Sequence, residues 1–245
     1  IHIMSTVIVP ARFASSRFPG KVLAPIGGEP MIVRVLKQCL ETVAVQVHVV
    51  TDEVRVAEAV AHLDVGVHMS PADIATGTDR IAFVAKDLQD DVIINVQGDE
   101  PFIPPQLIND LIYQLESIPE LNMNSACTPF LPEDDITNSN HVKVVMDRND
   151  YALYFSRCPI PFDRENKGGI TRYKHIGIYG YRRDFLLRYA KMDKTALESV
   201  EMLEQLRALE NGERIKMIQT AYRPVSVDTE QDLHRAEEYF RQHYK

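Results

Sequence analysis

Short runs of β-branched residues alternate, along the first half of the chain, with segments in which apolar residues recur every three or four positions. The strand-like runs are residues 6–10, 45–51 and 91–99. The helix-like segments are residues 31–40, 56–63 and 107–115. Uninterrupted apolar runs are typical of strands buried in a parallel sheet, and the longer spacing is typical of helices that bury one face. The pattern therefore predicts an α/β layered fold.

The second half of the chain replaces this alternation with extended runs. Between residues 124 and 181, these runs are separated by Pro, Asn and Gly, which predicts an inserted antiparallel sheet. The stretch ALESVEMLEQLRALENG at 196–212 predicts one long helix that ends at Gly212. A strand near 214–220 and a last helix from about residue 229 follow. Because we find no repeat, low-complexity segment or flexible linker, we expect a single domain over residues 1–245.

Composition and charge limit the kinds of partner. The chain of 245 residues has 45% hydrophobic and 25% charged residues, as ordinary globular proteins do. Its formal charge is −8, from 27 Lys and Arg against 35 Asp and Glu, which argues against a general electrostatic affinity for nucleic acid. An anion site in this protein must therefore be local.

The sequence also indicates a compartment. No apolar stretch approaches the length that crosses a bilayer, and the N-terminus lacks the regions of a secretory signal. The three cysteines, Cys39, Cys127 and Cys158, have no metal-ligand spacing and fit a reducing environment. We therefore expect a cytoplasmic protein without membrane contact. We also expect that residues 1–3 are a cloning remnant and that Met4 is the native start.

The turn VPARFASSRFPGK, residues 9–21, follows the first strand-like run and is rich in cations and small residues. Its cations are Arg12, Arg17 and Lys21. Its serines and glycine would let backbone N–H groups wrap phosphate oxygens while the cations supply charge. The spacing matches neither the Walker loop nor G-x-G-x-x-G. A nucleotide triphosphate is the predicted ligand, and a surface turn with solvated cations is the alternative.

Two further motifs follow predicted strands. ATGTDRI at 75–81 precedes an amphipathic helix, so it is either an anion site at a helix start or simply a cap formed by Thr78 or Asp79. In VQGDEPFI, Asp99 leaves a buried strand beside a glycine, and a carboxylate in that place next to phosphates indicates Mg²⁺. Ligands of open α/β sheets collect at the carboxyl ends of the strands. We therefore expect these motifs and the basic turn to form one site.

Six longer motifs give the chain a family resemblance. They are VPARFASSRFPGKVLAPIGGEPMI, ATGTDRI, INVQGDEPFIPP, YFSRCPIPF, YKHIGIYGY and LEQLRALENGERI, and the match runs in order through nearly all of residues 5–245. Together they resemble the 3-deoxy-manno-octulosonate (Kdo) cytidylyltransferases, also called CMP-Kdo synthetases. The resemblance implies a Rossmann-like nucleotide-diphospho-sugar transferase fold with an inserted antiparallel sheet. It also implies a homodimer that uses Mg²⁺ to transfer CMP from CTP to the anomeric hydroxyl of an eight-carbon keto-acid sugar. Pyrophosphate is released, and the product feeds lipopolysaccharide assembly.

The resemblance assigns roles residue by residue. The CTP phosphates would be held by Arg12, Ser16, Arg17 and Lys21, and the backbone of Ala11 would touch the nucleotide. The cytosine would be read by Ser70, Thr76 and Gly77, of which Ser70 follows a strand ending at Met69. The Mg²⁺ ligands would be Asp99 and Asp228. The sugar acid would be bound by Arg80, Gln97, Arg157, His175 and Glu201.

The catalytic work implied by these roles is electrostatic. A hydroxyl attacks a shielded α-phosphate and pyrophosphate leaves, so positioning and charge neutralisation dominate. One Mg²⁺ on Asp99 and Asp228 would bind the sugar carboxylate and acidify its anomeric hydroxyl, and a second would bridge the triphosphate oxygens. Lys21 and Arg17 would neutralise the departing pyrophosphate. The simpler alternative for Asp228 is a cap on the helix that follows it.

The predicted sugar contacts also have simpler alternatives. His175 stands in an alternating run where it could be a hydrogen-bonded strand histidine. Arg157 could pair with Asp163 or Glu165, and Glu201 could belong to a solvated or ion-paired helix face.

The acceptor stays open at this stage. The segment 162–175 looks shorter than in many members, which leaves an 8-amino-8-deoxy form of the sugar as an alternative. A sialic-type nine-carbon acid or a sugar phosphate is another, although Arg157 and His175 argue against a phosphate acceptor. A catalytically silent nucleotide-binding module is the alternative outside catalysis. Such a module would be expected to lose a metal carboxylate, whereas Asp99 and Asp228 are both present.

Overall fold

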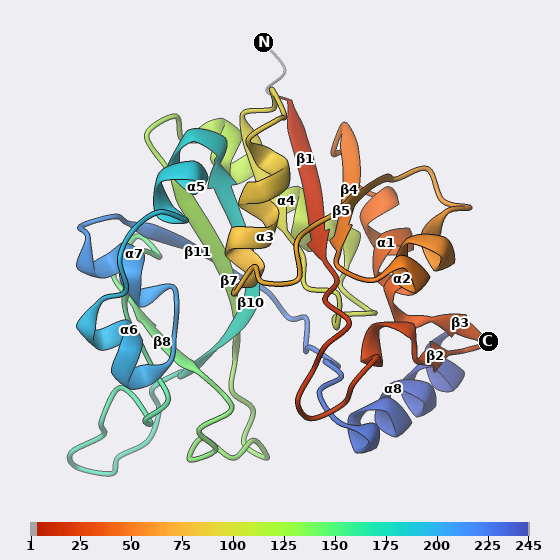
Figure 1. The fold of residues 1–245 in the computed structure, drawn as a ribbon. Coiled ribbons are helices and arrows are strands. Elements are labelled where there is room, and N and C mark those ends of the chain that lie inside the picture. The colour runs from red at the N-terminus through yellow and green to blue at the C-terminus, as the bar shows by residue number, and fades with distance from the viewer. Residues whose placement is uncertain (1–3, 245) are drawn as a thin grey trace.

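The computed structural model describes residues 4–244 and contains one large mixed sheet with helices on both sides (Figure 1). Nine strands of the described residues form this sheet, in the order β11-β7-β10-β6-β1-β4-β5, with β8 beside β10 and β9 beside β8. The strands are β1 (Ser5–Pro10), β4 (Gln46–Thr51), β5 (Gly66–Met69), β6 (Val92–Asn95), β7 (Met123–Pro129), β8 (Lys143–Met146), β9 (Ala152–Ser156), β10 (Tyr173–Arg182) and β11 (Ile215–Gln219). The expected cloning remnant, residues 1–3, lies outside the described residues.

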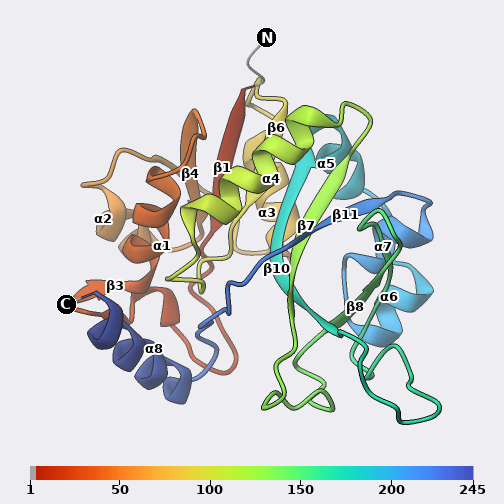
Figure 2. The ribbon, with the colours of Figure 1, turned by 180° about the vertical axis from the view of Figure 1, so that it is seen from behind.

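Helices flank the sheet, and α1, α2 and α4 pack on one face while α3 and α5 pack on the other (Figure 2). The helices are α1 (Met31–Leu40), α2 (Val54–Val60), α3 (Gly77–Ala85), α4 (Pro105–Ser117), α5 (Arg183–Tyr189), α6 (Ala196–Glu201), α7 (Leu206–Glu210) and α8 (Glu230–His243). The 3-10 helix η1 (Lys21–Leu23) and a small hairpin of β2 (Pro25–Ile26) and β3 (Glu29–Pro30) lie between β1 and α1.

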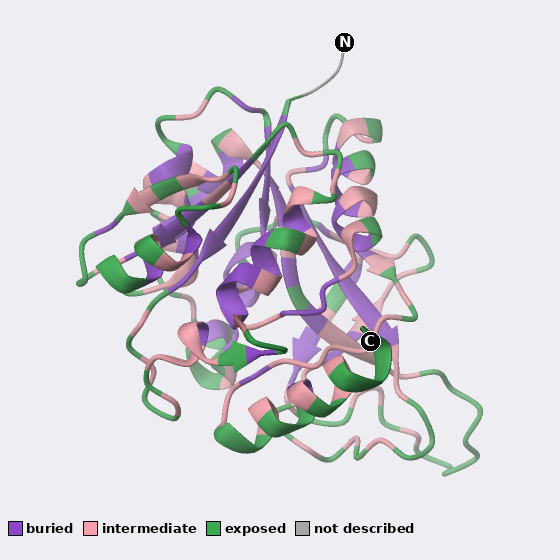
Figure 3. Cartoon of the chain, turned by 90° about the vertical axis from the view of Figure 1, so that its right-hand side faces the viewer, coloured by how far each residue is buried: buried purple, intermediate pink, exposed green. Residues whose placement is uncertain are grey.

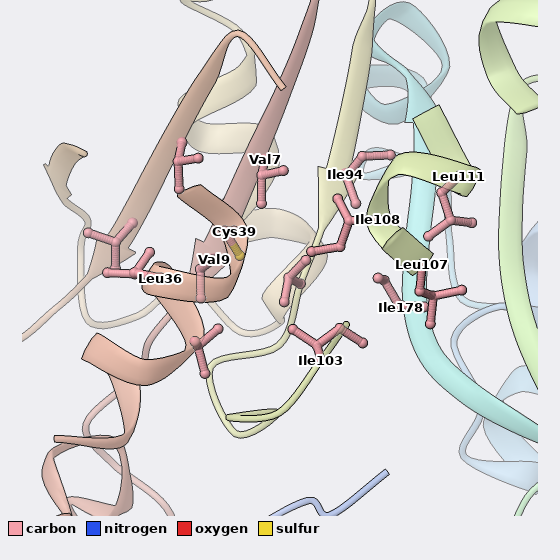
Figure 4. Packing of buried hydrophobic residues seen from close by; sticks show 14 of the residues in the cluster. Val7, Val9, Leu36, Cys39, Ile94, Ile103, Leu107, Ile108, Leu111 and Ile178 are labelled. Carbon is pink, nitrogen blue, oxygen red and sulfur yellow. The ribbon is translucent and has the colours of Figure 1, made fainter. Parts of the chain in front are cut away.

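The alternation of side chains along β1 explains the two layers, because successive residues of a strand point to opposite faces. Val7 and Val9 belong to an apolar cluster with α1 and α4, whereas Ile8 between them belongs to the cluster on the α3 and α5 face. Figure 4 shows the first cluster, in which Leu36 of α1 and Ile108 of α4 lie to the left and right of Val7 and Val9 on the same face of the sheet. The central strands are accordingly the most buried part of the molecule (Figure 3).

The strand pairing confirms the expected α/β fold with antiparallel strands. β1 pairs in parallel with β4 and β6, and β4 with β5, whereas β10 is antiparallel to β6 and β7. The antiparallel strands of 124–181 therefore extend the main sheet instead of forming a sheet of their own. Because β1, β4 and β6 are parallel, the segments after Pro10, Thr51 and Asn95 meet at one edge.

The prediction of one long helix at 196–212 is wrong. The chain forms α6, which ends at Glu201, and α7, which begins at Leu206. Met202 between them is left-handed, with φ 54° and ψ 47°. The Arg157 guanidinium donates to the carbonyl oxygens of Glu201 and Met202, at 2.7 and 3.2 Å. These carbonyls are therefore satisfied by a side chain from another element, and the helix ends there.

Candidate active site

A polar cavity opens at the carboxyl edge of the parallel strands. Its volume is about 350 Å³, and its walls come from the segments after β1 and β6, the start of α3 and the residue two positions before α8. Ten residues predicted from the sequence line it: Arg12, Ser16, Arg17, Lys21, Thr76, Gly77, Arg80, Gln97, Asp99 and Asp228. We call it the first cavity.

The basic turn after β1 is closed by its own backbone. The Gly20 N–H donates to the Phe13 carbonyl at 3.0 Å, and Gly20 has a φ of 72°, which favours glycine. The Phe13 N–H donates to Asp52 at 3.2 Å, which ties the turn to the residue after β4. The N–H groups of residues 14–17 have no acceptor within residues 4–244. Such amides beside guanidinium groups suit phosphate oxygens.

Lys21 lies between the two predicted metal carboxylates. Its Nζ donates to Asp99 Oδ2 at 2.8 Å and to Asp228 Oδ1 at 3.0 Å. Burial acts to lower the pKa of Lys21, but the charges and hydrogen bonds of the two carboxylates outweigh it, so this pKa is raised. Arg17 adds a longer ion pair to Asp228, at 3.7 Å. The Lys21 ammonium is thus held in its charged form where the two carboxylates converge.

Asp228 does not cap α8, so that alternative is wrong. The cap is Thr229, whose hydroxyl oxygen accepts from the Asp232 N–H at 3.2 Å while the Asp232 carboxylate accepts from the Thr229 N–H at 2.9 Å. This reciprocal capping box serves the helix start. The Asp228 carboxylate therefore lies toward Lys21 and contributes its charge to the first cavity.

The start of α3 is capped by Thr76, whose hydroxyl oxygen accepts from the Asp79 N–H at 3.0 Å. Thr78 and Asp79 lie inside the helix, so the expectation that one of them is the cap was wrong by two or three positions. Because the helix begins at Gly77, its first turn faces the first cavity. A helix start in this place favours anions.

Arg80 of α3 lines the first cavity although only 2% of it is exposed. Its guanidinium donates to the Ser70 hydroxyl and lies 3.6 Å from Asp52. Ser70 does not line the cavity and contacts it through Arg80.

Ala11, predicted to touch the nucleotide, is buried, and its N–H donates to the Val50 carbonyl at 2.9 Å. Only the carbonyl of Ala11 is therefore left for a nucleotide. The predicted roles of Ser70 and Ala11 stay predictions.

A second cavity of about 190 Å³ adjoins the first, because Gly77 and Gln97 line both. Its other lining residues are Thr78, Asn95, Tyr179, Tyr181, Tyr189, Glu204 and Gln205. Two acceptor atoms in these residues, Asn95 Oδ1 and Glu204 Oε1, are buried and have no hydrogen-bond partner in the described part of the chain. Burial raises the pKa of Glu204. The second cavity thus offers unsatisfied acceptors beside aromatic rings.

Glu204, Gln205 and Tyr179 line the second cavity but were not predicted as site residues. Glu204 and Gln205 reach the second cavity because the chain breaks at Met202 and restarts as α7. In the continuous helix that was predicted, Glu204 and Gln205 would lie on a charged face and would not be recognised as site residues. The Gly-x-Tyr alternation around Tyr179 was visible, but it does not show which ring lines a cavity.

Arg157 and Glu201 contact each other and line neither cavity. The Arg157 N–H donates to the Glu201 carboxylate at 3.0 Å, and the Ser156 hydroxyl donates to it at 2.6 Å. Neither Asp163 nor Glu165 pairs with Arg157, and Glu201 is not a solvated face residue. These contacts hold β9 against the end of α6, and a role in sugar binding stays a prediction.

His175 lies one layer behind the second cavity. Its Nε2 is 2.9 Å from the Ser125 hydroxyl, and its ring packs edge-on against Phe155 with 4.9 Å between centroids. The ring of Tyr179, which lines the second cavity, is 5.5 Å away. Burial lowers the pKa of His175 to about 3, so the ring is neutral. Direct contact of His175 with a sugar stays a prediction.

The donor set of the first cavity fits Mg²⁺. Within residues 4–244, no group of three or more His, Cys, Asp or Glu side chains is placed to hold a metal ion. Mg²⁺, however, is usually bound through one or two carboxylates together with substrate phosphates. Asp99 and Asp228 already direct their oxygens at one cation, the Lys21 ammonium. Two carboxylates beside a basic turn therefore suit a metal ion whose remaining ligands are phosphate oxygens of the nucleotide.

The fold and the site together define a nucleotidyltransferase of the cytidylyltransferase class, and a family model described as Cytidylyltransferase matches residues 6–215. Within this class, the chain belongs to the 3-deoxy-manno-octulosonate cytidylyltransferase family. A relative of that name from Geobacter sulfurreducens is 46% identical over 241 residues, covering 94% of this chain and 96% of the relative. One from Fusobacterium nucleatum is 43% identical over 236 residues and covers 96% of each chain.

Solved structures agree with this family. A structure of CMP:2-keto-3-deoxy-manno-octonic acid synthetase complexed with CTP is similar with a TM-score of 0.93 and 36% identity, covering 98% of this chain and 99% of that one. The 4-diphosphocytidyl-2C-methyl-D-erythritol synthase of Anaerococcus prevotii has a TM-score of 0.65 at 14% identity, which shows the fold alone. None of the helices within residues 4–244 is long and apolar enough to span a membrane.

Proposed function

We propose that this protein transfers CMP from CTP to the anomeric hydroxyl of Kdo and releases pyrophosphate, which activates the sugar for lipopolysaccharide synthesis. The observation that carries the proposal is the juxtaposition of two cavities that share Gly77 and Gln97. One has the charges that a triphosphate needs, and the other has the acceptors that sugar hydroxyls need. A CTP α-phosphate placed where they meet would face a hydroxyl on the sugar.

The triphosphate would be bound by the basic turn. The N–H groups of residues 14–17 and the side chains of Arg12 and Arg17 supply donors from one side. The first turn of α3 supplies the positive end of a helix from the other. Held from both sides, the phosphates would be oriented for attack, which is a large part of the catalytic effect in phosphoryl-group chemistry.

Asp99 and Asp228 would hold Mg²⁺, which when bound supplies positive charge that neutralises phosphate oxygens and acidifies a coordinated hydroxyl. The Lys21 ammonium now occupies the point where both carboxylates converge. It would turn from the carboxylates to the phosphate oxygens of CTP, where it neutralises the charge that builds on pyrophosphate. While the two carboxylates bind it, the pKa of Lys21 is raised, so the side chain is charged before CTP arrives.

The sugar acid would enter the second cavity. Its hydroxyl groups would donate to Asn95 Oδ1 and Glu204 Oε1, which otherwise have no partner in residues 4–244. Gln205 and Tyr179 would add further polar contacts from the same cavity wall. A hydrogen-bonding site of this kind rejects acceptors that lack the matching hydroxyls.

The test is pyrophosphate release from CTP with a panel of acceptors. We expect Mg²⁺-dependent release with Kdo, and the 8-amino-8-deoxy sugar and a sialic-type acid serve as competing acceptors within the same chemistry. ATP and GTP should react poorly. Equal turnover with a hexose 1-phosphate, or none with either eight-carbon keto acid, would overturn the proposal. CTP binding without turnover on any acceptor would favour a silent nucleotide-binding module.

We further propose a cytoplasmic homodimer. Its interface would include apolar side chains on β9, on α6 and just after α6 that are unusually exposed, namely Leu153 at 62%, Val200 at 84% and Met202 at 72%. β9 and the end of α6 are joined by a hydrogen bond from the Ser156 hydroxyl to the Glu201 carboxylate, so these side chains belong to neighbouring elements. A second copy of the chain is the natural cover for such a patch. Sedimentation of wild type and Val200→Glu should give a dimer and a monomer, and a monomeric wild type contradicts the proposal.

A further inference from the structure

Glu100 contacts the segment that leads to Asp228, which we call the approach segment, residues 220–227. This segment precedes α8 and contains no helix or strand. The Tyr222 hydroxyl donates to Glu100 Oε2 at 3.2 Å, and the Ser226 hydroxyl donates to Glu100 Oε1. Each oxygen of one carboxylate therefore binds a different residue of the approach segment.

A third hydrogen bond joins the same two parts of the chain. The Val227 N–H donates to the carbonyl oxygen of Asp99 at 3.2 Å. Asp99 and Glu100 thus bind Tyr222, Ser226 and Val227 in turn, up to the residue before Asp228. The two residues Asp99 and Glu100 therefore supply one carboxylate of the pair and also bind the segment that leads to the other, Asp228.

The other side of the approach segment is apolar. Val225 and Val227 pack in a small cluster with Phe18, Phe102 and Ala236, the last of which belongs to α8. The alternation of apolar and polar contacts shows that residues 225–228 are extended, with Ser226 and Asp228 on the polar side. Apolar packing sets the distance of the segment from α8, but because it is not directional, it does not fix the position of the segment along the cluster. The hydrogen bonds to Asp99 and Glu100 are directional and fix that position.

We infer that Glu100 is a positioning residue for the reaction: it fixes the approach segment so that the Asp228 carboxylate faces Asp99. Glu100 lines neither cavity and so contacts neither CTP nor the sugar in this arrangement. The inference rests on the proposed Mg²⁺ role of Asp99 and Asp228. Metal ligands held by outer hydrogen bonds lose affinity by about 10–100-fold when those bonds are removed. Asp99 follows a strand, whereas Asp228 follows only coil, so Asp228 is the ligand that needs such support.

The experiment measures Mg²⁺ affinity in Glu100→Ala, Tyr222→Phe and Ser226→Ala. Calorimetric titration of Mg²⁺ into the CTP-loaded enzyme without sugar gives a readout that does not depend on turnover. The Mg²⁺ dependence of pyrophosphate release separates kcat from the half-saturating Mg²⁺ concentration. We expect Glu100→Ala to weaken Mg²⁺ about 10-fold, at the lower end of that range. The two single-donor variants should each lose about 3-fold, and kcat at saturating Mg²⁺ should change little.

The pattern across variants distinguishes positioning from simple stabilisation. Glu133→Ala, which removes an exposed glutamate, is the matched control and should equal wild type. The double variant Glu100→Ala/Ser226→Ala should lose no more Mg²⁺ affinity than Glu100→Ala, because Glu100→Ala already removes the hydrogen bond between the two side chains. Unchanged Mg²⁺ affinity in folded Glu100→Ala or in both single-donor variants overturns the inference. Asp228→Asn is the separate check: if it too leaves Mg²⁺ affinity unchanged, the proposed metal site itself fails.

Discussion

The two cavities adjoin, yet they are built from different parts of the protein. The first is lined mostly by charged groups on turns, and the Arg17 and Asp228 side chains there are 63% and 45% exposed. The second is lined by aromatic rings on β10 and α5. Tyr181 and Tyr189 are each 1% exposed there, with 6.0 Å between their ring centroids.

The difference fits the chemistry that we propose for each cavity. Phosphates and Mg²⁺ are bound through strong charges, which act over several ångströms and tolerate side chains that move. Hydroxyl groups are recognised by acceptors in fixed places, because a neutral hydrogen bond with poor geometry contributes little binding free energy. Turns at the surface can therefore carry the first kind of site. The second needs acceptor atoms that packing buries and holds in place, such as Asn95 Oδ1 at the end of β6 and Glu204 Oε1 in the turn before α7.

The carboxylates of the first cavity should be the most sensitive part. Asp228→Asn keeps the shape but removes a charge that Mg²⁺ needs, so turnover should fall about 10³-fold. Partial recovery is expected at high Mg²⁺ or with Mn²⁺. The melting temperature should hardly change, because Thr229 and Asp232 cap α8. Pyrophosphate release and thermal unfolding measure the two effects, with Asp193→Asn as an exposed control. Normal turnover at low Mg²⁺ would mean that Asp228 is not a metal ligand.

Lys21 should have the next largest effect, and in two opposite directions. Lys21→Met should lower turnover about 10²-fold, because pyrophosphate loses a neutralising charge. The same variant should bind Mn²⁺ more tightly without CTP, because no ammonium then competes for Asp99 and Asp228. Spectroscopic titration of free Mn²⁺ measures this affinity. The exposed Lys191→Met is the control. Weaker Mn²⁺ binding in Lys21→Met would show that the lysine does not compete with the metal.

The second cavity should respond more mildly and for one substrate only. Gln205→Ala should raise KM for the sugar acid about 10-fold, the scale of one lost hydrogen bond, and leave KM for CTP nearly unchanged. Steady-state kinetics with each substrate varied in turn separate the two values. Gln242→Ala on α8 is an exposed control. A rise in KM for CTP instead would show that the nucleotide, and not the sugar, occupies the second cavity.

His175 should affect stability on the acid side. Its pKa is about 3 in the folded protein because it is buried, and roughly 6.5 when unfolded. The unfolded chain therefore binds the extra proton, and stability falls as pH drops from about 6.5 toward 3. Between pH 7 and 4, wild type should lose on the order of 3 kcal/mol more than His175→Gln. Urea unfolding across this range measures the difference, with exposed His62→Gln as control. If the free energy of unfolding of wild type and His175→Gln depended on pH in the same way, the pKa of His175 would not be lowered in the folded protein.

Periodicity predicted the parts of the fold that local sequence determines. The expected helix at 31–40 coincides with α1, and the last helix begins one residue after the expected 229. In both, the apolar spacing and the flanking residues agree with the tertiary contacts. The run at 91–99 ends as a strand at Asn95, because residues 96–99 turn into the first cavity.

The remaining features depend on contacts that no local pattern shows. The helix at 196–212 breaks because Arg157, the residue after β9, binds two of its carbonyl groups. Nothing within 196–212 indicates that interaction, so the placement of Glu204 and Gln205 could not be foreseen. The first cavity was predictable because cations, glycines and isolated carboxylates at strand ends are unusual. The second cavity was not predictable, because in the sequence its tyrosines and polar residues resemble those of an ordinary protein core.

The contact between Lys21 and Asp228 joins residues that are 207 positions apart, and this has a consequence for synthesis of the protein. As the chain leaves the ribosome, β1, α1 and β4 can pack early, since they are close in sequence. The carboxylate pair forms only after residue 228 has emerged and its segment has closed a very long loop. A nascent chain would therefore present its basic turn to cellular nucleotides well before it could act on them. Activity would begin only after residue 228 has left the ribosome.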